Sequence, residues 1–194
     1  MSKQTIFSIL FTVCIAFTAL GQEKPQSRFS HRGLKLVLGA GSFEAAPDQN
    51  LNEGEGGMLG LGWGFTDHFS LWINVLGAEH TRKTSEILTD FAGLELNLQH
   101  KFITESRLQP YGKVGIGGYS LQAQNSDTAF TGIGVNLALG MDLFFSRHFG
   151  VGAELMIKSL DYSYKSFNDG KITEKLSPET DGDTVGFMVT FTIQ

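Results

Sequence analysis

The sequence predicts an all-β fold: an eight-stranded antiparallel up-and-down transmembrane β-barrel, with both chain termini in the periplasm. Three observations predict it. Apolar and polar residues alternate with a period of two along almost the whole chain after residue 32. One face of this alternation is apolar, whereas the other carries glycine and charge. The connections between the alternating stretches are in turn long and short. A chain of 194 residues is long enough for one such closed sheet.

The first element, residues 1–21, is interpreted as a secretory signal peptide that is cleaved before Gln22. Lys3 gives it a positive start, residues 6–20 are mostly apolar, and small residues stand at the positions that a signal peptidase reads. A membrane-spanning helix is the alternative, but the apolar run is shorter than the roughly 20 residues needed to cross a bilayer. Cys14 is the one cysteine of the chain, so we expect no disulfide after cleavage.

Residues 22–32 are polar and are expected to form a flexible periplasmic lead-in, and residues 33–194 the barrel domain. The period of two places the expected strands at 33–43, 55–65, 69–80, 88–102, 110–121, 130–145, 149–164 and 184–194. No stretch of a dozen residues shows the 3.6-residue period of an amphipathic helix.

The first four strands share one pattern, in which every second side chain is large and apolar. Their apolar faces carry Leu34, Leu36 and Leu38; Leu59, Leu61, Trp63 and Phe65; Phe69, Leu71, Ile73 and Val75; and Leu94, Leu96, Leu98 and Phe102. Their other faces carry Lys35, Gly39 and Gly41; Gly60, Gly62 and Gly64; Ser70 and Asn74, with Trp72 as a large exception; and Gly93, Glu95, Asn97, Gln99 and Lys101.

The last four strands repeat the pattern. Their apolar faces carry Val114 and Ile116; Ile133, Val135, Leu137, Leu139, Met141, Leu143 and Phe145; Phe149, Val151, Ala153, Leu155 and Ile157; and Val185, Phe187, Val189, Phe191 and Ile193. The other faces carry Lys113, Gly115 and Gly117; Gly132, Gly134, Asn136, Gly140 and Asp142; Gly152, Glu154 and Lys158; and Gly186, Thr190 and Thr192, with Met156 and Met188 as exceptions.

Glycine indicates which face points inward. A soluble lipocalin-like barrel would hold the apolar face inside, and a membrane barrel would turn it to the lipid. On a solvent-exposed face glycine would only weaken the strands. Inside an eight-stranded barrel the bore is so narrow that many positions must be small. The glycine-and-charge face is therefore expected to line the lumen.

Two further patterns agree with a membrane barrel. The expected connections 44–54, 81–87, 122–129 and 165–183 are longer than the turns 66–68 and 146–148, and 103–109 is of medium length. Barrels with long extracellular loops and tight periplasmic turns show this pattern. Aromatic residues of the apolar face gather at the strand ends next to the short turns, where they predict a periplasmic girdle at the membrane interface. These residues are Trp63, Phe65, Phe69, Phe102, Phe145, Phe149 and Phe191.

With these residues, the chain resembles the small outer-membrane β-barrel family of the OmpA and OmpX type. One local match is sharper: Gly186, Val189 and Phe191 stand in the last strand as in the insertion signal of such barrels, although the chain continues past the aromatic residue to Gln194. The resemblance implies an outer-membrane location, lipid and lipopolysaccharide as surroundings, and the barrel-assembly machinery as a partner during insertion.

Seven charged residues of the inward face are the candidate site: Lys35, Glu95, Lys101, Lys113, Asp142, Glu154 and Lys158. Because an unpaired charge in a narrow bore is costly, we expect a hydrogen-bonded network that plugs the lumen. Lys113 is expected near Asp142 on the neighbouring strand, with Glu95 on its other side. A narrow channel for ions or small solutes is the alternative reading of the same residues.

The function expected from the sequence is non-enzymatic: envelope structure, or binding and adhesion through loops 44–54 and 165–183. Within the second loop, Asn168-Asp169-Gly170-Lys171 predicts a tight turn, so the last two strands are expected to continue as a hairpin above the membrane. A lipid A-modifying enzyme is less favoured, because no Ser, His and acidic residues come together as a catalytic set. A soluble lipid-binding barrel is less favoured, because the glycine-and-charge face is expected to line the lumen. No cofactor or metal site is expected. A net charge of −5 without basic clusters argues against nucleic acid.

Overall fold

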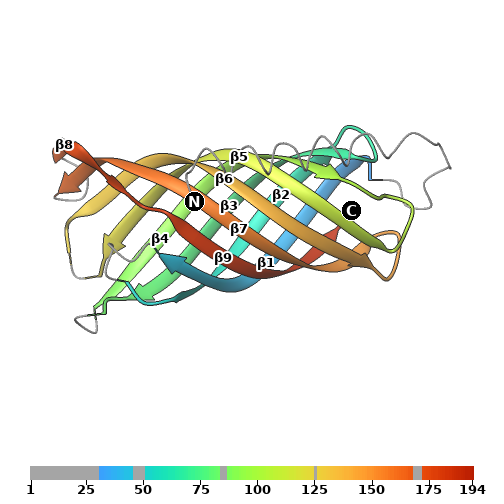
Figure 1. The fold of residues 1–194 in the computed structure, drawn as a ribbon, viewed down its shortest axis with the longest axis horizontal. Helices are drawn as coiled ribbons and strands as arrows, with labels where there is room; N and C mark the ends of the chain where they lie inside the picture. The colour runs from blue at the N-terminus through green and yellow to red at the C-terminus, as the bar shows by residue number, and fades with distance from the viewer. Residues whose placement is uncertain (1–30, 46–50, 84–86, 125, 168–171) are drawn as a thin grey trace, which may run out of the picture.

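The computed structural model describes residues 31–45, 51–83, 87–124, 126–167 and 172–194, and they form an antiparallel sheet closed into a barrel (Figure 1). The expected signal peptide and most of the expected lead-in lie outside the described residues. Among the described residues, no helix is long and apolar enough to span a membrane.

The residues that the structure describes form nine strand segments. They are β1 (Gly33–Ala45), β2 (Gly54–Gly64), β3 (Phe69–Thr81), β4 (Leu88–Lys101), β5 (Leu108–Ala123), β6 (Ala129–Phe144), β7 (Phe149–Phe167), β8 (Ile172–Asp181) and β9 (Thr184–Ile193). Each of the eight predicted strands is present, with ends that differ from the prediction by up to three residues. The expected hairpin beyond the last two strands is also present, because β7 runs on to Phe167 and pairs there with β8.

The ring closes through two pairings that join distant parts of the sequence. β1 pairs with β9 from Leu36 opposite Ile193 to Ala45 opposite Thr184. β9 also pairs with β7, from Ile193 opposite Phe149 to Thr184 opposite Lys158. β6 also pairs with β7, so β1 to β7 and β9 make an eight-stranded ring and β8 lies outside it. The predicted last strand, 184–194, is β9, and β8 lies within the predicted loop 165–183.

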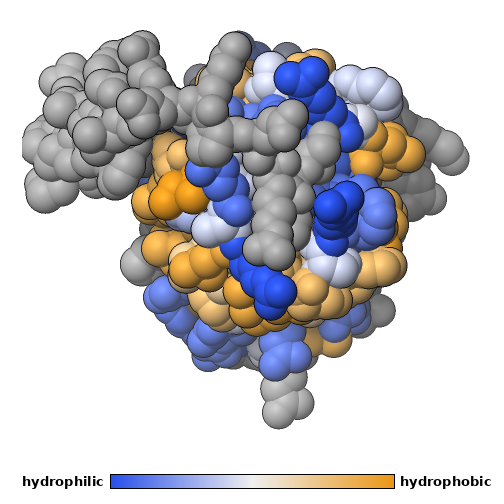
Figure 2. All heavy atoms as spheres, turned by 90° about the vertical axis from the view of Figure 1, so that its right-hand side faces the viewer, coloured by the Kyte–Doolittle hydropathy of each residue, from blue (hydrophilic) through white to orange (hydrophobic). Residues whose placement is uncertain are grey.

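Burial alternates along the strands as the period of two requires. In β3 the odd-numbered residues from Phe69 to Glu79 are exposed and the even-numbered residues from Ser70 to His80 are buried. The exposed large apolar residues are those of the predicted apolar face. Figure 2, which looks at the short-turn end, shows apolar side chains in orange along parts of the rim. An apolar exterior around an interior that holds charged groups is the arrangement of a barrel in lipid.

The two ends of the barrel differ in their connections. At one end, here called the short-turn end, β2 joins β3 through residues 65–68 and β6 joins β7 through residues 145–148. The C-terminus lies at this end and β8 at the opposite, long-loop end (Figure 1). The hydroxyls of Thr66 and Ser146 stabilise these two turns. Each hydroxyl accepts two hydrogen bonds, from the backbone N–H groups of the residues two and three positions later.

Inward-facing glycine makes room in the bore for a large side chain on the neighbouring strand. Gly62 stands opposite Trp72 and Gly140 opposite Tyr111 in the register of neighbouring strands. A Cβ atom at residue 62 would lie 2.6 Å from the Trp72 ring, and one at residue 140 would lie 2.3 Å from the Tyr111 ring. Because real Cβ atoms do not come so close to their neighbours, these two inward positions accept glycine alone without a shift of the ring.

Candidate functional site in the barrel lumen

The structure buries all seven charged residues of the candidate site inside the barrel. Their exposed fractions lie between 2% and 6%, and they are Lys35, Glu95, Lys101, Lys113, Asp142, Glu154 and Lys158. They come from β1, β4, β5, β6 and β7, and six of them form ion pairs inside the barrel.

The ion pair nearest the long-loop end joins Lys158 of β7 to Glu95 of β4. The same carboxylate accepts two more hydrogen bonds, from the hydroxyl of Tyr119 at 2.9 Å and from the side-chain amide of Asn97 at 3.1 Å. Asn136 donates in turn to the Tyr119 hydroxyl at 3.3 Å. The charge of Glu95 is therefore neutralised and its oxygens are well bonded, which a buried carboxylate requires.

The middle ion pair joins Lys113 of β5 to Glu154 of β7. The Tyr111 hydroxyl donates to the same carboxylate at 2.8 Å. The Lys113 ammonium also lies over aromatic rings, 5.1 Å from the centre of Tyr111 and 5.7 Å from that of Trp72. These rings stabilise the ammonium by cation–π attraction where water is excluded.

The third ion pair, nearest the short-turn end, joins the Lys101 ammonium to the Asp142 carboxylate at 3.0 Å. Lys101 also donates to the amide oxygen of Gln109 at 2.8 Å and lies 4.5 Å from the centre of the Phe144 ring. Gln109 completes its bonds by donating to the carbonyl oxygens of Thr104 and Ser106.

The predicted pairing of these charges is wrong in detail. Lys113 was expected beside Asp142, but the register of β5 and β6 places Ala138 opposite Lys113 and Gln109 opposite Asp142. The four-residue offset separates the two charges along the barrel axis, so Asp142 pairs with Lys101. Glu95, expected to flank Lys113, pairs with Lys158 instead.

Lys35 is the fourth lysine of the network and differs from the others. Its ammonium donates to the Ser70 hydroxyl at 2.7 Å. Within the described part of the chain, no carboxylate lies within ion-pair distance of it. The network is thus three ion pairs and one lysine held by a hydroxyl.

The short-turn end is closed by a residue that the sequence did not single out. His31 is fully buried and its ring packs against that of Phe144, with 5.5 Å between centroids. Its Nδ1 is 2.7 Å from the side-chain oxygen of Gln194, and its backbone N–H donates to Asp67. Burial, reinforced by the neighbouring Lys101 ammonium, lowers the pKa of His31 to about 4. His31 is therefore neutral at pH 7.

Gln194, three residues after the aromatic residue Phe191, also makes hydrogen bonds at the short-turn end. Its backbone N–H donates to the carbonyl of His148, and its side-chain amide donates to the carbonyl of Arg147. The C-terminal residue thereby fastens the β6–β7 turn and the His31 segment to one another.

The inward side chains of the described strands are buried in the lumen. A cavity of about 10 Å³ lies in the middle of the lumen. The ion pairs Lys158–Glu95 and Lys113–Glu154 line it, together with Asn74, Asn97 and Asn136. That volume is room for about one water molecule. Towards the long-loop end the filling is apolar, in a cluster that includes Phe43, Met58, Leu76, Phe91, Leu160 and Tyr162.

These inward aromatic and aliphatic residues are what the sequence analysis missed. Tyr111 and Tyr119 have the same parity in β5 as Lys113 and Gly117, so the period of two could have placed them in the lumen. Near the long-loop end the signal weakens, because Leu76 follows Val75 and both faces of the strand are apolar there.

The predicted aromatic girdle lies on the outer surface at the short-turn end. Trp63, Phe65, Phe69, Phe145 and Phe149 are between 40% and 56% exposed, and Phe102 and Phe191 are half-buried. Phe149 stacks on Phe145 and on Phe191, with ring centroids 6.5 and 6.1 Å apart. His100, which is also on the outer face, stacks on Phe69 at 4.5 Å.

The residues of the predicted insertion signal lie in β9. Val189 points outward and is 56% exposed, Phe191 belongs to the aromatic girdle, and Gly186 faces the lumen. Their part in insertion stays a prediction.

Sequence comparison decides the family. The outer membrane protein beta-barrel domain family matches residues 11–191, nearly the whole chain. The chain belongs to this family. No curated protein matches it by sequence.

Solved barrel structures share the fold of this chain, although their sequence identity to it is low. OprG from Pseudomonas aeruginosa aligns with a TM-score of 0.61 and 14% identity, covering 87% of this chain and 98% of that one. The Neisserial surface protein A aligns with a TM-score of 0.57 and 13% identity, covering 83% and 96%. Ail of Yersinia pestis, an attachment invasion locus protein, aligns with a TM-score of 0.51 and 12% identity, covering 84% and 98%. Such likeness establishes the fold alone.

No site for a metal ion emerges from the part of the chain that the structure describes: no three His, Cys, Asp or Glu side chains gather to hold one. What the lumenal groups can do chemically is to neutralise one another in pairs.

Proposed function

We propose that this protein is a non-enzymatic, non-conducting outer-membrane barrel that strengthens the envelope and presents its long-loop end for binding. The observation that carries the proposal is the set of three buried ion pairs, which cross the lumen one above another. Each is formed between strands that are not neighbours in the ring, so each ties together strands that no backbone hydrogen bonds join. An ion would have to break all three pairs to pass.

Orientation follows the same proposal. The short-turn end with the C-terminus lies in the periplasm, and the β7–β8 hairpin projects from the cell. The chain would reach this place through a signal peptide, residues 1–21, and the barrel-assembly machinery. Outer-membrane lipid and lipopolysaccharide surround it there.

The β7–β8 hairpin is the part best suited to contact a ligand outside the cell. β8 pairs with β7 beyond the ring, and among the described residues no strand pairs with its other edge. Tyr164 and Ile172 on this hairpin are 47% and 53% exposed. An open strand edge with exposed apolar side chains supports pairing with an extended segment of a partner. Parts of the two predicted binding loops, 46–50 and 168–171, lie outside the described residues.

Conductance across a planar bilayer tests the plug. The wild-type protein should give no steady ion current, because six of its seven lumenal charges are paired and Lys35 is held by the Ser70 hydroxyl. A double variant, Glu95→Ala with Glu154→Ala, removes two of the three pairs and should conduct if it folds. A steady current through the wild-type protein would overturn the proposal and favour the narrow channel.

Surface labelling tests the orientation. Lys175→Cys in β8 should react with a large maleimide reagent on intact cells, because the mature chain otherwise lacks cysteine. Ser146→Cys in the β6–β7 turn should react once the outer membrane is permeabilised. The reverse pattern would contradict the proposed orientation.

A further inference from the structure

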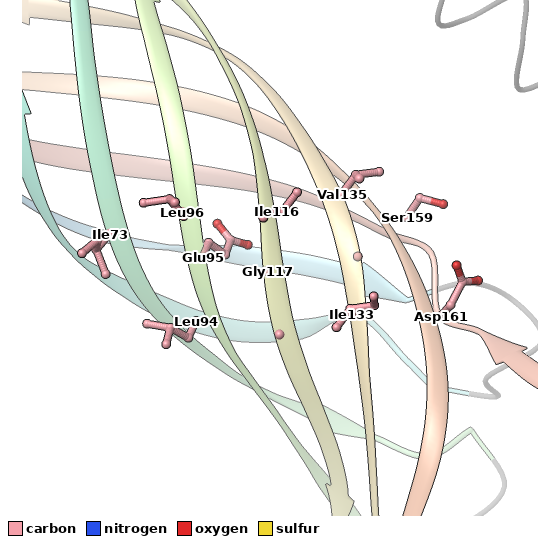
Figure 3. A pocket seen from close by; sticks show the side chains of 12 residues that line it. Ile73, Leu94, Glu95, Leu96, Ile116, Gly117, Ile133, Val135, Ser159 and Asp161 are labelled. Atoms are coloured by element: carbon pink, nitrogen blue, oxygen red, sulfur yellow. The ribbon is translucent and has the colours of Figure 1, made fainter. Parts of the chain in front are cut away.

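The upper part of the β7–β8 hairpin stands clear of the apolar band of the barrel. On the outer side of β7 the apolar residues Leu155 and Ile157 are followed by the polar residues Ser159 and Asp161, which Figure 3 shows on this strand. This change marks the upper edge of the band. Beyond it, β7 runs on and pairs with residues 172–175 of β8.

β8 presents an edge that is exposed on both faces of the strand. Residues 172–175 pair with β7 along one edge, and no strand in the described ranges pairs with the other edge. The side chains of all four residues are exposed, whereas the ring strand β3 buries every second side chain. The backbone N–H and C=O groups of such an edge can extend the sheet by one further strand.

Two consecutive residues of this edge carry opposite charges, Glu174 and Lys175. Among the residues that the structure describes, neither side chain forms an ion pair or a hydrogen bond. Lys165 stands opposite Glu174 in the register, but its ammonium lies over the Phe167 ring, 4.6 Å from the ring centre. A strand that pairs with this edge would therefore match it best with a positive charge opposite Glu174 and a negative charge opposite Lys175.

A second copy of the same edge meets this requirement when the two copies run antiparallel. If residue 174 stands opposite residue 175 of the copy, each glutamate faces a lysine. A shift by one residue in either direction brings Glu174 opposite Glu174 or Lys175 opposite Lys175, which is unfavourable. Pro178 has no backbone N–H to donate, so the matched register pairs residues 172–177 and ends there.

The direction of pairing decides how the two barrels stand. Two copies side by side in one membrane are related by an axis along the membrane normal. Because barrel strands are tilted by about 35–45° from that normal, the two β8 strands would run in the same sense, with Glu174 level with Glu174. Copies in two membranes that face one another run antiparallel.

From these observations we propose that the β8 edge pairs with the β8 edge of a second copy in a facing membrane, so that the protein joins two cells through contact with itself. The two hairpins then form one sheet of four strands. Each β8 is used up by its copy, so this contact closes at two molecules. The inference names the partner of the long-loop end; it rests on the proposed orientation and is independent of the plugged lumen.

Association of lipid nanodiscs tests the pairing. The full mature protein is placed at one barrel per disc, and sedimentation velocity should show wild-type discs associating in pairs. Glu174→Lys sets lysine against lysine twice, and Lys175→Glu sets glutamate against glutamate twice. Each variant should weaken the pairing about tenfold, because two attractive cross-strand pairs become repulsive. Both sites are exposed, so both variants should fold and keep normal heat-modifiable gel mobility.

Mixing the two single variants is the sharper arm. The two lysines of one variant then face the two glutamates of the other, so mixed discs should pair like the wild type although neither variant pairs alone. A chain with both substitutions should pair with itself and not with the wild type. Glu79→Lys is the matched control, because Glu79 is an exposed acidic residue near the long-loop end of β3. It should pair like the wild type.

Three results would overturn the proposal. Wild-type discs that stay single are the first, and pairing that both single variants retain is the second. The third is resonance energy transfer between labelled copies within one vesicle without association of discs, which would place the copies side by side in one membrane. None of these results bears on the conductance or the surface labelling, so the proposed function is tested separately.

Discussion

The two halves of the barrel interior are filled by different chemistry. The half towards the short turns is polar, with the ion pairs Lys101–Asp142 and Lys113–Glu154 and the buried His31. The half towards the long loops holds an apolar cluster with Phe43, Leu76, Phe91, Leu160 and Tyr162. The Glu95–Lys158 pair and the Tyr119 hydroxyl bonded to it lie where the two halves meet.

The difference teaches how a narrow barrel can be filled in two ways. In the polar half each charge depends on a particular partner, so removal of one group leaves another buried and unpaired. In the apolar half the contacts are many, weak and non-directional, so removal of one side chain leaves a cavity. The polar half should therefore respond to single substitutions more strongly than the apolar half.

The largest effect is expected where one partner of an ion pair is removed. Glu95→Ala leaves the Lys158 ammonium buried and takes an acceptor from Tyr119 and Asn97, so the free energy of unfolding should fall by about 4 kcal/mol. Reversible urea unfolding in lipid vesicles measures it. In the double variant Glu95→Leu with Lys158→Met, most of this loss should be recovered. A single variant as stable as the wild type would show that the pair braces nothing.

A smaller effect is expected in the apolar half. Leu160→Ala should lower the free energy of unfolding by about 3 kcal/mol, because it opens a cavity among fully buried neighbours. Leu155→Ala on the same strand is the control, since Leu155 faces the lipid and lipid chains can fill the space it leaves. Equal losses in the two variants would contradict the assignment of Leu160 to a packed interior.

Interior glycine offers a test that is independent of charge. Gly62→Ala would bring a methyl group against the Trp72 ring and should destabilise the barrel by about 2 kcal/mol through overpacking. Gly77→Ala, on the outer face, should change stability little. Trp72 also donates to Gln99 at 2.6 Å, so fluorescence of the displaced indole would report the shift directly. Tolerance of Gly62→Ala without a spectral change would mean that the bore is wider than the structure shows.

The sequence alone was enough to predict the strands and their faces, because alternation in a barrel wall is enforced at every residue by the contrast between lipid and lumen. Leu71, Ile73 and Val75 could not point inward without bringing Trp72 and Asn74 into lipid. The partners of the charges could not be predicted in the same way. Pairing depends on strand register and on reach across the bore, and neither leaves a pattern along the chain: Asp142 lies one strand from Lys113 yet pairs with Lys101.

The closure of the short-turn end was also not predictable. His31 stands in a polar stretch before the first strand, and nothing in its neighbours marks it as buried. Its position depends on Gln194, which is 163 residues away in the sequence, and on Phe144. A contact between residues so far apart in the sequence forms when the ring closes.

The smallest expected effect concerns this closure and is a dependence on pH. The pKa of His31 is about 4 in the folded protein, below the value of about 6.5 for an exposed histidine. The unfolded chain therefore binds a proton first as the pH falls. The stabilisation is complete above pH 6.5 and is lost progressively between pH 6.5 and pH 4, by about 1–2 kcal/mol at pH 5.

Hydrogen exchange of the backbone amides at the start of β1, measured from pH 7.5 to pH 5 with correction for intrinsic exchange, should show this loss as local opening of the short-turn end. His31→Phe keeps an aromatic ring against Phe144 but carries no titrating group, so its opening should not change over this range. A pH dependence that persists in His31→Phe would have to come from Asp67 or the other charges that face this position, Lys35, Lys101 and Asp142. Such a result would place the sensitive group in the charged network and leave His31 as packing alone.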